Sequence, residues 1–163
     1  MRNLISQRAQ PILAMIAILA ATPSAPTHAQ DVKALCERVA NDDRVRPIPI
    51  TLVPAARQAF SLPGSASEIE VQKSTSFRCK DKKVWLCNTG ANLVCGKANV
   101  SRASAGAANF CKQNPNADIV PMAATGHDTI YEWKCSGNKA IISKEIVTLD
   151  PAGFIAENWK PAE

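Results

Sequence analysis

The sequence is poor in the residues on which most catalytic and metal sites depend. It has two histidines and one tyrosine in 163 residues, and aromatic residues make up only 5%. His127 is the one histidine beyond residue 29. A single imidazole excludes a multi-histidine metal site and any mechanism that needs two imidazoles, and neither G-x-S-x-G nor H-E-x-x-H occurs. We therefore expect no metal and no cofactor.

Cysteine spacing excludes two further kinds of site. No C-x-x-C is present, so neither a zinc knuckle nor a thioredoxin-like redox site is indicated. The six cysteines are Cys36, Cys79, Cys87, Cys95, Cys111 and Cys135. Their even number suits a disulfide framework in an oxidising compartment, and we expect three disulfides. Many pairings are open, and Cys95–Cys111 is the preferred local pair.

No apolar run is long enough to cross a bilayer comfortably, since a membrane-spanning helix needs roughly 20 apolar residues. The longest run, Pro11–Ala21, follows a basic start and precedes the small-residue triplet Thr27–Ala29. These are the parts of a secretory signal peptide, which we assign to residues 1–29. An uncleaved anchor is the alternative, and Pro23 and Pro26 disfavour it because they would break the continuing helix. We expect a periplasmic or secreted protein with no stable membrane anchor.

Charge gives little support for nucleic-acid binding. Beyond residue 29 the chain carries 17 Lys and Arg against 14 Asp and Glu, a net charge of +3. Lys80, Lys82 and Lys83 form the densest basic cluster, and no aromatic platform is interleaved with them. Ala91–Lys97 superficially resembles a phosphate-binding loop, but Ala98 stands where that loop requires Ser or Thr.

Helices and an extended segment are expected first along the chain. Asp31–Asn41 has apolar residues at helical spacing. Arg46–Pro54 holds three prolines, which favour an extended chain. Pro54 can then begin a second helix over Ala55–Phe60, and Ser61–Ser67 indicates a turn.

The pattern then changes to an alternation that predicts strands. The expected strands are Glu68–Cys79, Val84–Cys87, Asn92–Cys95, Thr129–Cys135 and Ala140–Leu149. Ser101–Lys112 is rich in alanine and predicts an inserted helix capped by Ser101. Phe77 with Cys79, and Trp85 with Cys87, are expected to face one common core. No internal repeat is apparent.

His127 and Asp128 are the only catalytic candidates. A general base needs an orienting carboxylate and a nucleophile in reach, but adjacent side chains on a strand point to opposite faces. A turn in which both side chains bond the backbone is the favoured interpretation. Glu68 and Glu70 could form a paired acid on one strand face, although exposed charges at a strand edge are the commoner explanation.

Several stretches of the sequence look familiar as a set. They are R-P-I-P (46–49), L-V-P-A-A-R (52–57), V-W-L-C-N-T-G-A-N-L-V-C-G-K-A-N (84–99), T-G-H-D-T-I-Y-E-W-K-C (125–135) and G-F-I-A-E-N-W (153–159). Together they resemble a group of small exported bacterial proteins of unknown function. The resemblance covers nearly all the chain after residue 29 and implies export and a cysteine-stapled fold, but it brings no catalytic residue. Size, compartment and β content are also similar to those of small periplasmic lysozyme inhibitors, whose motifs the chain lacks.

The sequence thus predicts an α+β fold. We expect a small disulfide-stapled antiparallel sheet of about five strands, with short N-terminal helices and one inserted helix. Residues 30–67 form a helical and proline-rich segment, and 68–163 a β-rich part of the same domain. The favoured function is non-catalytic binding of an envelope component or a secreted protein. The alternatives are a small periplasmic hydrolase that uses His127 and Asp128, and a lysozyme-inhibitor-like protein.

Overall fold

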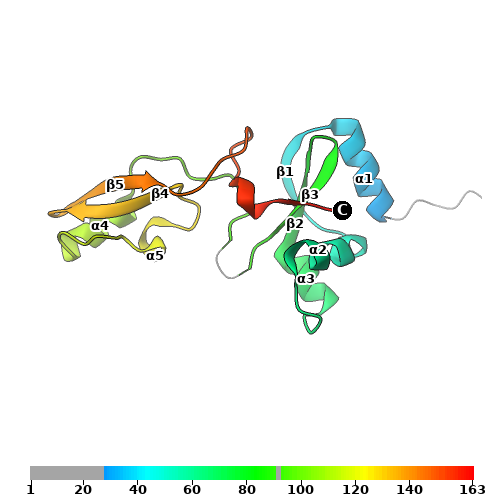
Figure 1. Cartoon of the computed structure of the whole chain (residues 1–163), viewed down its shortest axis with the longest axis horizontal. Helices are drawn as coiled ribbons and strands as arrows, with labels where there is room; N and C mark the ends of the chain where they lie inside the picture. The colour runs from blue at the N-terminus through cyan, green and yellow to red at the C-terminus, as the bar shows by residue number, and fades with distance from the viewer. Residues whose placement is uncertain (1–27, 91–92) are drawn as a thin grey trace, which may run out of the picture.

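The computed structural model describes residues 28–90 and 93–163, which form two lobes joined end to end (Figure 1). Both lobes combine helices with antiparallel strands, so the predicted α+β class is confirmed, with six strands in two sheets rather than about five in one. The expected signal peptide, residues 1–29, lies outside the described residues except for its last two. Within the described part, no helix is long and apolar enough to cross a membrane.

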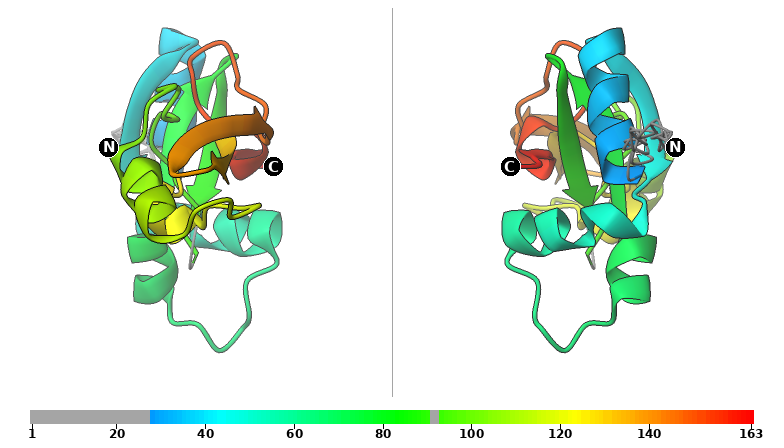
Figure 2. Two further views of the ribbon diagram at one scale, coloured as in Figure 1. Left: turned by 90° about the vertical axis from the view of Figure 1, so that its left-hand side faces the viewer. Right: turned by 90° about the vertical axis from the view of Figure 1, so that its right-hand side faces the viewer.

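The first lobe is a four-stranded antiparallel sheet with the strand order β1-β2-β3-β6. Its elements are α1 (His28–Val39), β1 (Asp42–Pro47), the 3₁₀ turn η1 (Ile50–Leu52), α2 (Val53–Phe60), α3 (Glu68–Ser74), β2 (Thr75–Lys80), β3 (Lys83–Asn88) and, from the C-terminus, β6 (Lys160–Pro161). Figure 2 shows α1 across the sheet and the loop between α2 and α3 projecting from the molecule. The core crosses the expected boundary at residues 67 and 68, because α1 and α2 pack on β2 and β3.

Two segments of this lobe are helical where extended chain was expected. Ser67 and Glu70 form a capping box that begins α3: the Ser67 hydroxyl accepts from the Glu70 N–H, and the Glu70 carboxylate accepts from the Ser67 N–H. The bond from the Ser67 backbone lowers the pKa of Glu70. Ile50–Leu52 turns helical just before Pro54, which lies in the first turn of α2. The predictions of a strand from residue 68 and of an extended chain up to Pro54 are therefore wrong.

The two faces of the first sheet belong to different cores. Phe77 and Cys79 face the helices, whereas Trp85 and Cys87 pack on the opposite side. Phe77 lies opposite Leu86 and not opposite Trp85, and directly opposed residues share a face. The prediction of one common core needs Phe77 opposite Trp85. The observed pairing of β2 with β3 differs from that by one position, which moves Trp85 and Cys87 to the other face of the sheet, so the prediction is wrong.

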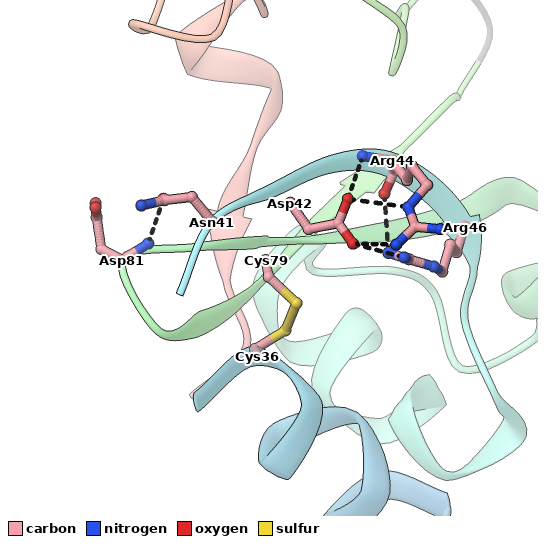
Figure 3. Close-up of a disulfide and its surroundings, with 7 residues drawn as sticks. All are labelled: Cys36, Asn41, Asp42, Arg44, Arg46, Cys79 and Asp81. Atoms are coloured by element: carbon pink, nitrogen blue, oxygen red, sulfur yellow. Dashed lines mark hydrogen bonds and ion pairs between the residues drawn. A yellow bond between two sulfur atoms is a disulfide. The ribbon is translucent and has the colours of Figure 1, made fainter. Parts of the chain in front are cut away.

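The outer strand β1 carries a charge cluster near the Cys36–Cys79 disulfide (Figure 3). Asp42 accepts hydrogen bonds from Arg44 Nε at 3.2 Å and from Arg46 Nη2 at 2.6 Å. These bonds hold the pKa of Asp42 well below its usual range. Charged side chains and Pro47 oppose the addition of another strand at a sheet edge, so β1 is a protected edge.

The second lobe is a β-hairpin backed by a helix. Its elements are α4 (Ala105–Gln113), α5 (Met122–Thr125), β4 (Tyr131–Ser136) and β5 (Lys139–Glu145), so the two predicted C-terminal strands are confirmed. The cap of α4 is Ser104 and not Ser101, since the Ser104 hydroxyl accepts from the Ala107 N–H at 3.1 Å. Residues 93–95 form no regular strand, so the strand expected there is wrong, and Asn92 lies outside the described residues.

The two lobes repeat one motif, which corrects the expectation of no internal repeat. In each, a helix carrying a disulfide cysteine leads through an extended segment and a short helix to a β-hairpin that carries the partner cysteine. The extended segment lies beside the first hairpin strand in both: β1 pairs with β2, and the Val120 N–H donates to the Trp133 C=O at 2.8 Å. We call residues 28–88 the first unit and 105–145 the second unit; α3 is an addition to the first.

The correspondence extends to single hydrogen bonds. Asn41 Oδ1 accepts from the Asp81 N–H at 2.9 Å (Figure 3), and Asn116 Oδ1 accepts from the Gly137 N–H at 2.8 Å. Each asparagine follows its helical cysteine by five positions, and each donating amide follows the strand cysteine by two. The hairpin registers agree as well: Phe77–Leu86, Arg78–Trp85 and Cys79–Val84 correspond to Trp133–Ile142, Lys134–Ile141 and Cys135–Ala140.

Three disulfides are present, as predicted, but the preferred pair Cys95–Cys111 is wrong. Cys36–Cys79 and Cys111–Cys135 join helix to hairpin within the two units, and Cys87–Cys95 closes a short loop after β3. Cys111 is fully buried on the face of α4 that packs on the hairpin. Its partner therefore comes from β4 and not from the connecting loop.

The chain finally returns from the second unit to the first. This return segment, residues 149–163, crosses the face of the first sheet that α1 leaves open, and includes the 3₁₀ turn η2 (Ala156–Asn158). The guanidinium carbon of Arg78 lies 4.1 Å from the Phe154 ring centroid and 4.6 Å from that of Trp159. Arg78 also donates to Asp150. The segment ends as β6 beside β3.

Candidate functional site

The predicted catalytic residues lie in a turn ahead of β4. His127 is exposed, and the Asp128 C=O accepts a hydrogen bond from the Asn99 N–H at 2.7 Å. Neither residue lines the two grooves described below or three smaller cavities among the described residues. The bond to Asn99 gives the turn a structural use, and a catalytic role for His127 and Asp128 stays a prediction.

The other sequence candidates are also placed by the fold. Glu68 and Glu70 lie in the first turn of α3, so they are not a paired acid on a strand face. Cys95 of the loop that superficially resembles a phosphate site is in a disulfide. In the described ranges, no three His, Cys, Asp or Glu side chains gather as metal ligands would.

Each unit has a groove between its helix and the beginning of its second hairpin strand. The first groove, of about 740 Å³, lies between α1 and β3. Its walls include Lys33, Glu37, Lys83, Val84, Ala162 and Glu163. The C-terminal residues thus form one side of this groove, and both lysines and acids line it.

The second groove, of about 540 Å³, lies at the equivalent place between α4 and β5. Ala108 and Lys112 of α4 stand where Lys33 and Glu37 stand on α1, and Lys139 and Ala140 of β5 stand where Lys83 and Val84 stand on β3. The buried Trp133 ring contributes to the floor. Sequence reasoning missed this groove altogether.

Charge distinguishes the two grooves. The second groove is lined by Arg102, Lys112 and Lys139 and by no acid. None of these three makes an ion pair with another described residue. Arg102 is instead placed over the Tyr131 ring, 5.5 Å from its centroid. Like charges held around one cleft focus the field and attract an anion.

The shape of the second groove suits an extended chain. Ser104, which caps α4, is followed at helical spacing by Ala108 and Lys112, so about 12 Å separates the two ends of this row. Small side chains, among them Ala103 and Ala140, leave the space open. A strand rises about 3.3 Å per residue, so the groove accommodates roughly four extended residues.

The strand edges beside the two grooves differ in their cover. In the first unit β6 lies along β3, and the Ala162 N–H donates to the Val84 C=O at 2.9 Å. In the second unit β5 pairs with β4 alone. No strand among residues 28–90 and 93–163 lies along the other edge of β5, where Ile141 is 39% exposed.

The repeat leaves a signal in the sequence that explains where the grooves are. The pattern C-x₄-N-x-D-x-V begins at Cys36 and again at Cys111. A second pattern begins at Phe77 and again at Trp133: an aromatic residue, a cation and a cysteine in succession, with a lysine four positions after the cysteine. The two cysteine separations, 43 and 24 residues, hide the repeat because α3 and its loop lengthen the first unit.

Comparisons with protein-family models, with curated proteins and with solved structures found no match to this chain. The function must therefore be argued from the chemistry of the two grooves.

Proposed function

We propose that the protein is an exported, non-catalytic binding protein that takes an anionic group of an envelope component or of a secreted protein into the second groove. The observation that carries the proposal is the set of three cations, Arg102, Lys112 and Lys139, which line one cleft without an acidic partner in the described chain. A bound anion would relieve their mutual repulsion and complete their hydrogen bonding.

The compartment in this proposal is the periplasm or the outside of the cell. Three disulfides persist in oxidising compartments and are rare in the cytosol, and the chain has no free cysteine among the described residues. Membership in the resembling group of small exported bacterial proteins belongs to the same proposal. Intact mass tests it: export predicts a chain that begins at Gln30 and is alkylated only after reduction. A retained N-terminus with reactive thiols would contradict it.

Binding is favoured over the hydrolase alternative by the place of the histidine. His127 is exposed on a turn and lines neither groove. A catalytic pair needs a cleft in which a nucleophile and a base meet the substrate. The second groove supplies a cleft, but the hydroxyl in its lining, that of Ser104, is engaged as the cap of α4. The polar groups that remain are three cations and the amide of Asn138, a set that suits the binding of an anion.

Amide chemical shifts during titration with tripolyphosphate and with triglutamate test the anion site. We expect saturable shifts confined to the groove, at Arg102–Ala108, Lys112, Trp133 and Asn138–Ala140. The variant Lys112→Glu should lose at least tenfold in affinity, because it puts an acid into the cluster. Lys134→Glu is the matched control: Lys134 is exposed on β4 and does not line the groove. Shifts spread evenly over surface lysines, or equal losses in both variants, would overturn the proposal.

A further inference from the structure

We propose that the second groove takes an extended peptide segment of a partner protein, which adds as a strand to the open edge of β5 and places a carboxylate among Arg102, Lys112 and Lys139. This inference rests on the proposed function and names the class of ligand. Strand addition is a general mode of peptide recognition, in which main-chain hydrogen bonds supply affinity and side-chain pockets supply specificity.

The first unit shows a strand edge that is covered by a chain segment beside an open groove. There the chain's own C-terminal segment lies along β3, with Pro161 opposite Trp85 and Lys160 opposite Leu86. Its last residues, Ala162 and Glu163, form a wall of the first groove. Because the two hairpins share one register, the same path along the second unit runs beside Ala140, Ile141 and Ile142.

The backbone of β5 offers the hydrogen bonds that this path needs. The Val84 C=O faces outward from β3 and accepts the Ala162 N–H at 2.9 Å. Ala140 occupies the position of Val84, so its N–H and C=O face outward from the hairpin as well. Ile141 stands where Trp85 stands, and at 39% exposure it offers an apolar contact on the far face of the added strand.

The open edge of β5 contrasts with the protected edge of the first unit. β1 carries Asp42, Arg44 and Arg46 in a bonded cluster and ends at Pro47, all of which oppose strand addition. β5 has neither proline nor a charged side chain over residues 140–142, and the shift of its register falls beyond them, at Ser143. Over these three residues the edge beside the cleft is available to a peptide.

The charges of the two grooves indicate the direction in which the bound peptide runs and the end that carries its carboxylate. In the first groove the C-terminal Glu163 shares the cavity with Lys82 and Lys83. The second groove is also lined by three cations, but no acid lines it, so the preference for an acid is stronger there. The occupant is therefore a segment that runs antiparallel to β5 and carries its carboxylate at its C-terminal end.

A synthetic peptide of residues 157–163, with a free C-terminal carboxylate, is the probe that tests strand addition. We expect amide shifts along β5 and around the second groove, and a Kd that weakens at least tenfold when the peptide is N-methylated at the position of Ala162. That N–H faces the strand edge in the first unit. N-methylation at the position of Glu163 is the matched control and should change the Kd less than threefold, because its N–H faces the other way.

The variants Lys139→Glu and Lys112→Glu should each weaken the unmethylated peptide at least fivefold, and Lys134→Glu should leave it unchanged. Equal effects of the two N-methyl groups would overturn strand addition; if tripolyphosphate still bound the groove, the proposed function would stand without it. Peptide shifts confined to the first groove, or a concentration-dependent dimer that the peptide dissociates, would also overturn the proposal, the latter in favour of a second copy as occupant.

Discussion

The guanidinium of Arg78 lies against the carboxylate of Asp150, although 72 residues separate the two in the chain. Their side chains are only 2% and 3% exposed. Asp150 also accepts the backbone N–H groups of Ala152 and Phe154 at 3.0 and 3.1 Å, which shapes the return segment around the arginine. One buried ion pair thus connects the sheet of the first unit to the return segment.

Loss of this pair should be among the most damaging single changes in the protein. Asp150→Ala leaves the Arg78 guanidinium buried without its counter-ion, which costs about 3–5 kcal/mol in comparable cases. Urea unfolding followed by tryptophan fluorescence gives the free energy of unfolding. Asp43→Ala is the control, because Asp43 and its partner Lys97 are both about half exposed and such pairs contribute about 1 kcal/mol or less. Similar losses in the two variants would contradict the role of Arg78–Asp150.

Stability should fall in acid partly because of Asp150. Burial by itself raises the pKa of Asp150, but the bonds from Arg78 and from the Phe154 N–H outweigh it, so the pKa lies below the ordinary 3.8. A carboxyl whose folded pKa is depressed stabilises the fold above its unfolded pKa and loses that contribution as the pH falls through the folded value. The free energy of unfolding should therefore decline below about pH 4.

The variant Asp150→Asn isolates this share of the acid sensitivity. The pKa values of Asp42 and Glu70 are also lowered, and their contributions remain in the variant. The gap in unfolding free energy between the parent and Asp150→Asn should be wide at pH 6 and narrow at pH 3. If the two proteins lost unfolding free energy in parallel as the pH fell, Asp150 would contribute nothing to the loss of stability in acid.

The three disulfides should differ in how much each adds to the free energy of unfolding, according to the length of the loop it closes. Cys36–Cys79, Cys111–Cys135 and Cys87–Cys95 span 43, 24 and 8 residues. Loop-closure entropy gives about 4, 3.5 and 2.5 kcal/mol for these lengths. Paired replacement by alanine, with urea unfolding as the measurement, should reproduce this order. A larger loss for Cys87–Cys95 than for Cys36–Cys79 would show that chain entropy is not the controlling factor.

The equivalent asparagines give a direct test of the repeat. Asn41→Ala and Asn116→Ala each remove the acceptor for one hairpin amide, and each should cost about 1 kcal/mol. The exposed Asn109 on α4 is the control, since replacement by alanine there favours the helix. If thermal unfolding responded to only one of the two variants, the two hydrogen bonds would not be equivalent in energy.

The fold was predictable from the sequence where local signals agree. Alternation from Thr129 and the turn at Gly137 predict the β4–β5 hairpin, and the helical spacing from Asp31 predicts α1. The strand predicted from Glu68 fails because the capping box between Ser67 and Glu70 is a stronger local signal than alternating polarity over a few residues. That error could have been avoided from the sequence.

The candidate site was not predictable in the same way. Arg102, Lys112 and Lys139 are separated by up to 37 positions in the numbering, and only the packing of α4 on β5 brings them around one cleft. The wrong disulfide pair, Cys95–Cys111, has the same origin: nearness in sequence does not reveal which strand a helix covers. Recognising the repeat would have supplied that information, because it pairs each helix with its own hairpin.

The second unit leaves and re-enters the first through neighbouring points. The Ala98 N–H donates to the Gly153 C=O at 2.9 Å, and Lys97 forms a β-bridge with Phe154. The second unit is therefore inserted in a loop of the first, and it has its own disulfide and its own small core. Adjacent points of entry and exit are the condition under which one domain tolerates insertion into another. We therefore expect that the second unit can be exchanged for another, or grafted into another protein, while the first unit keeps its sheet and β6.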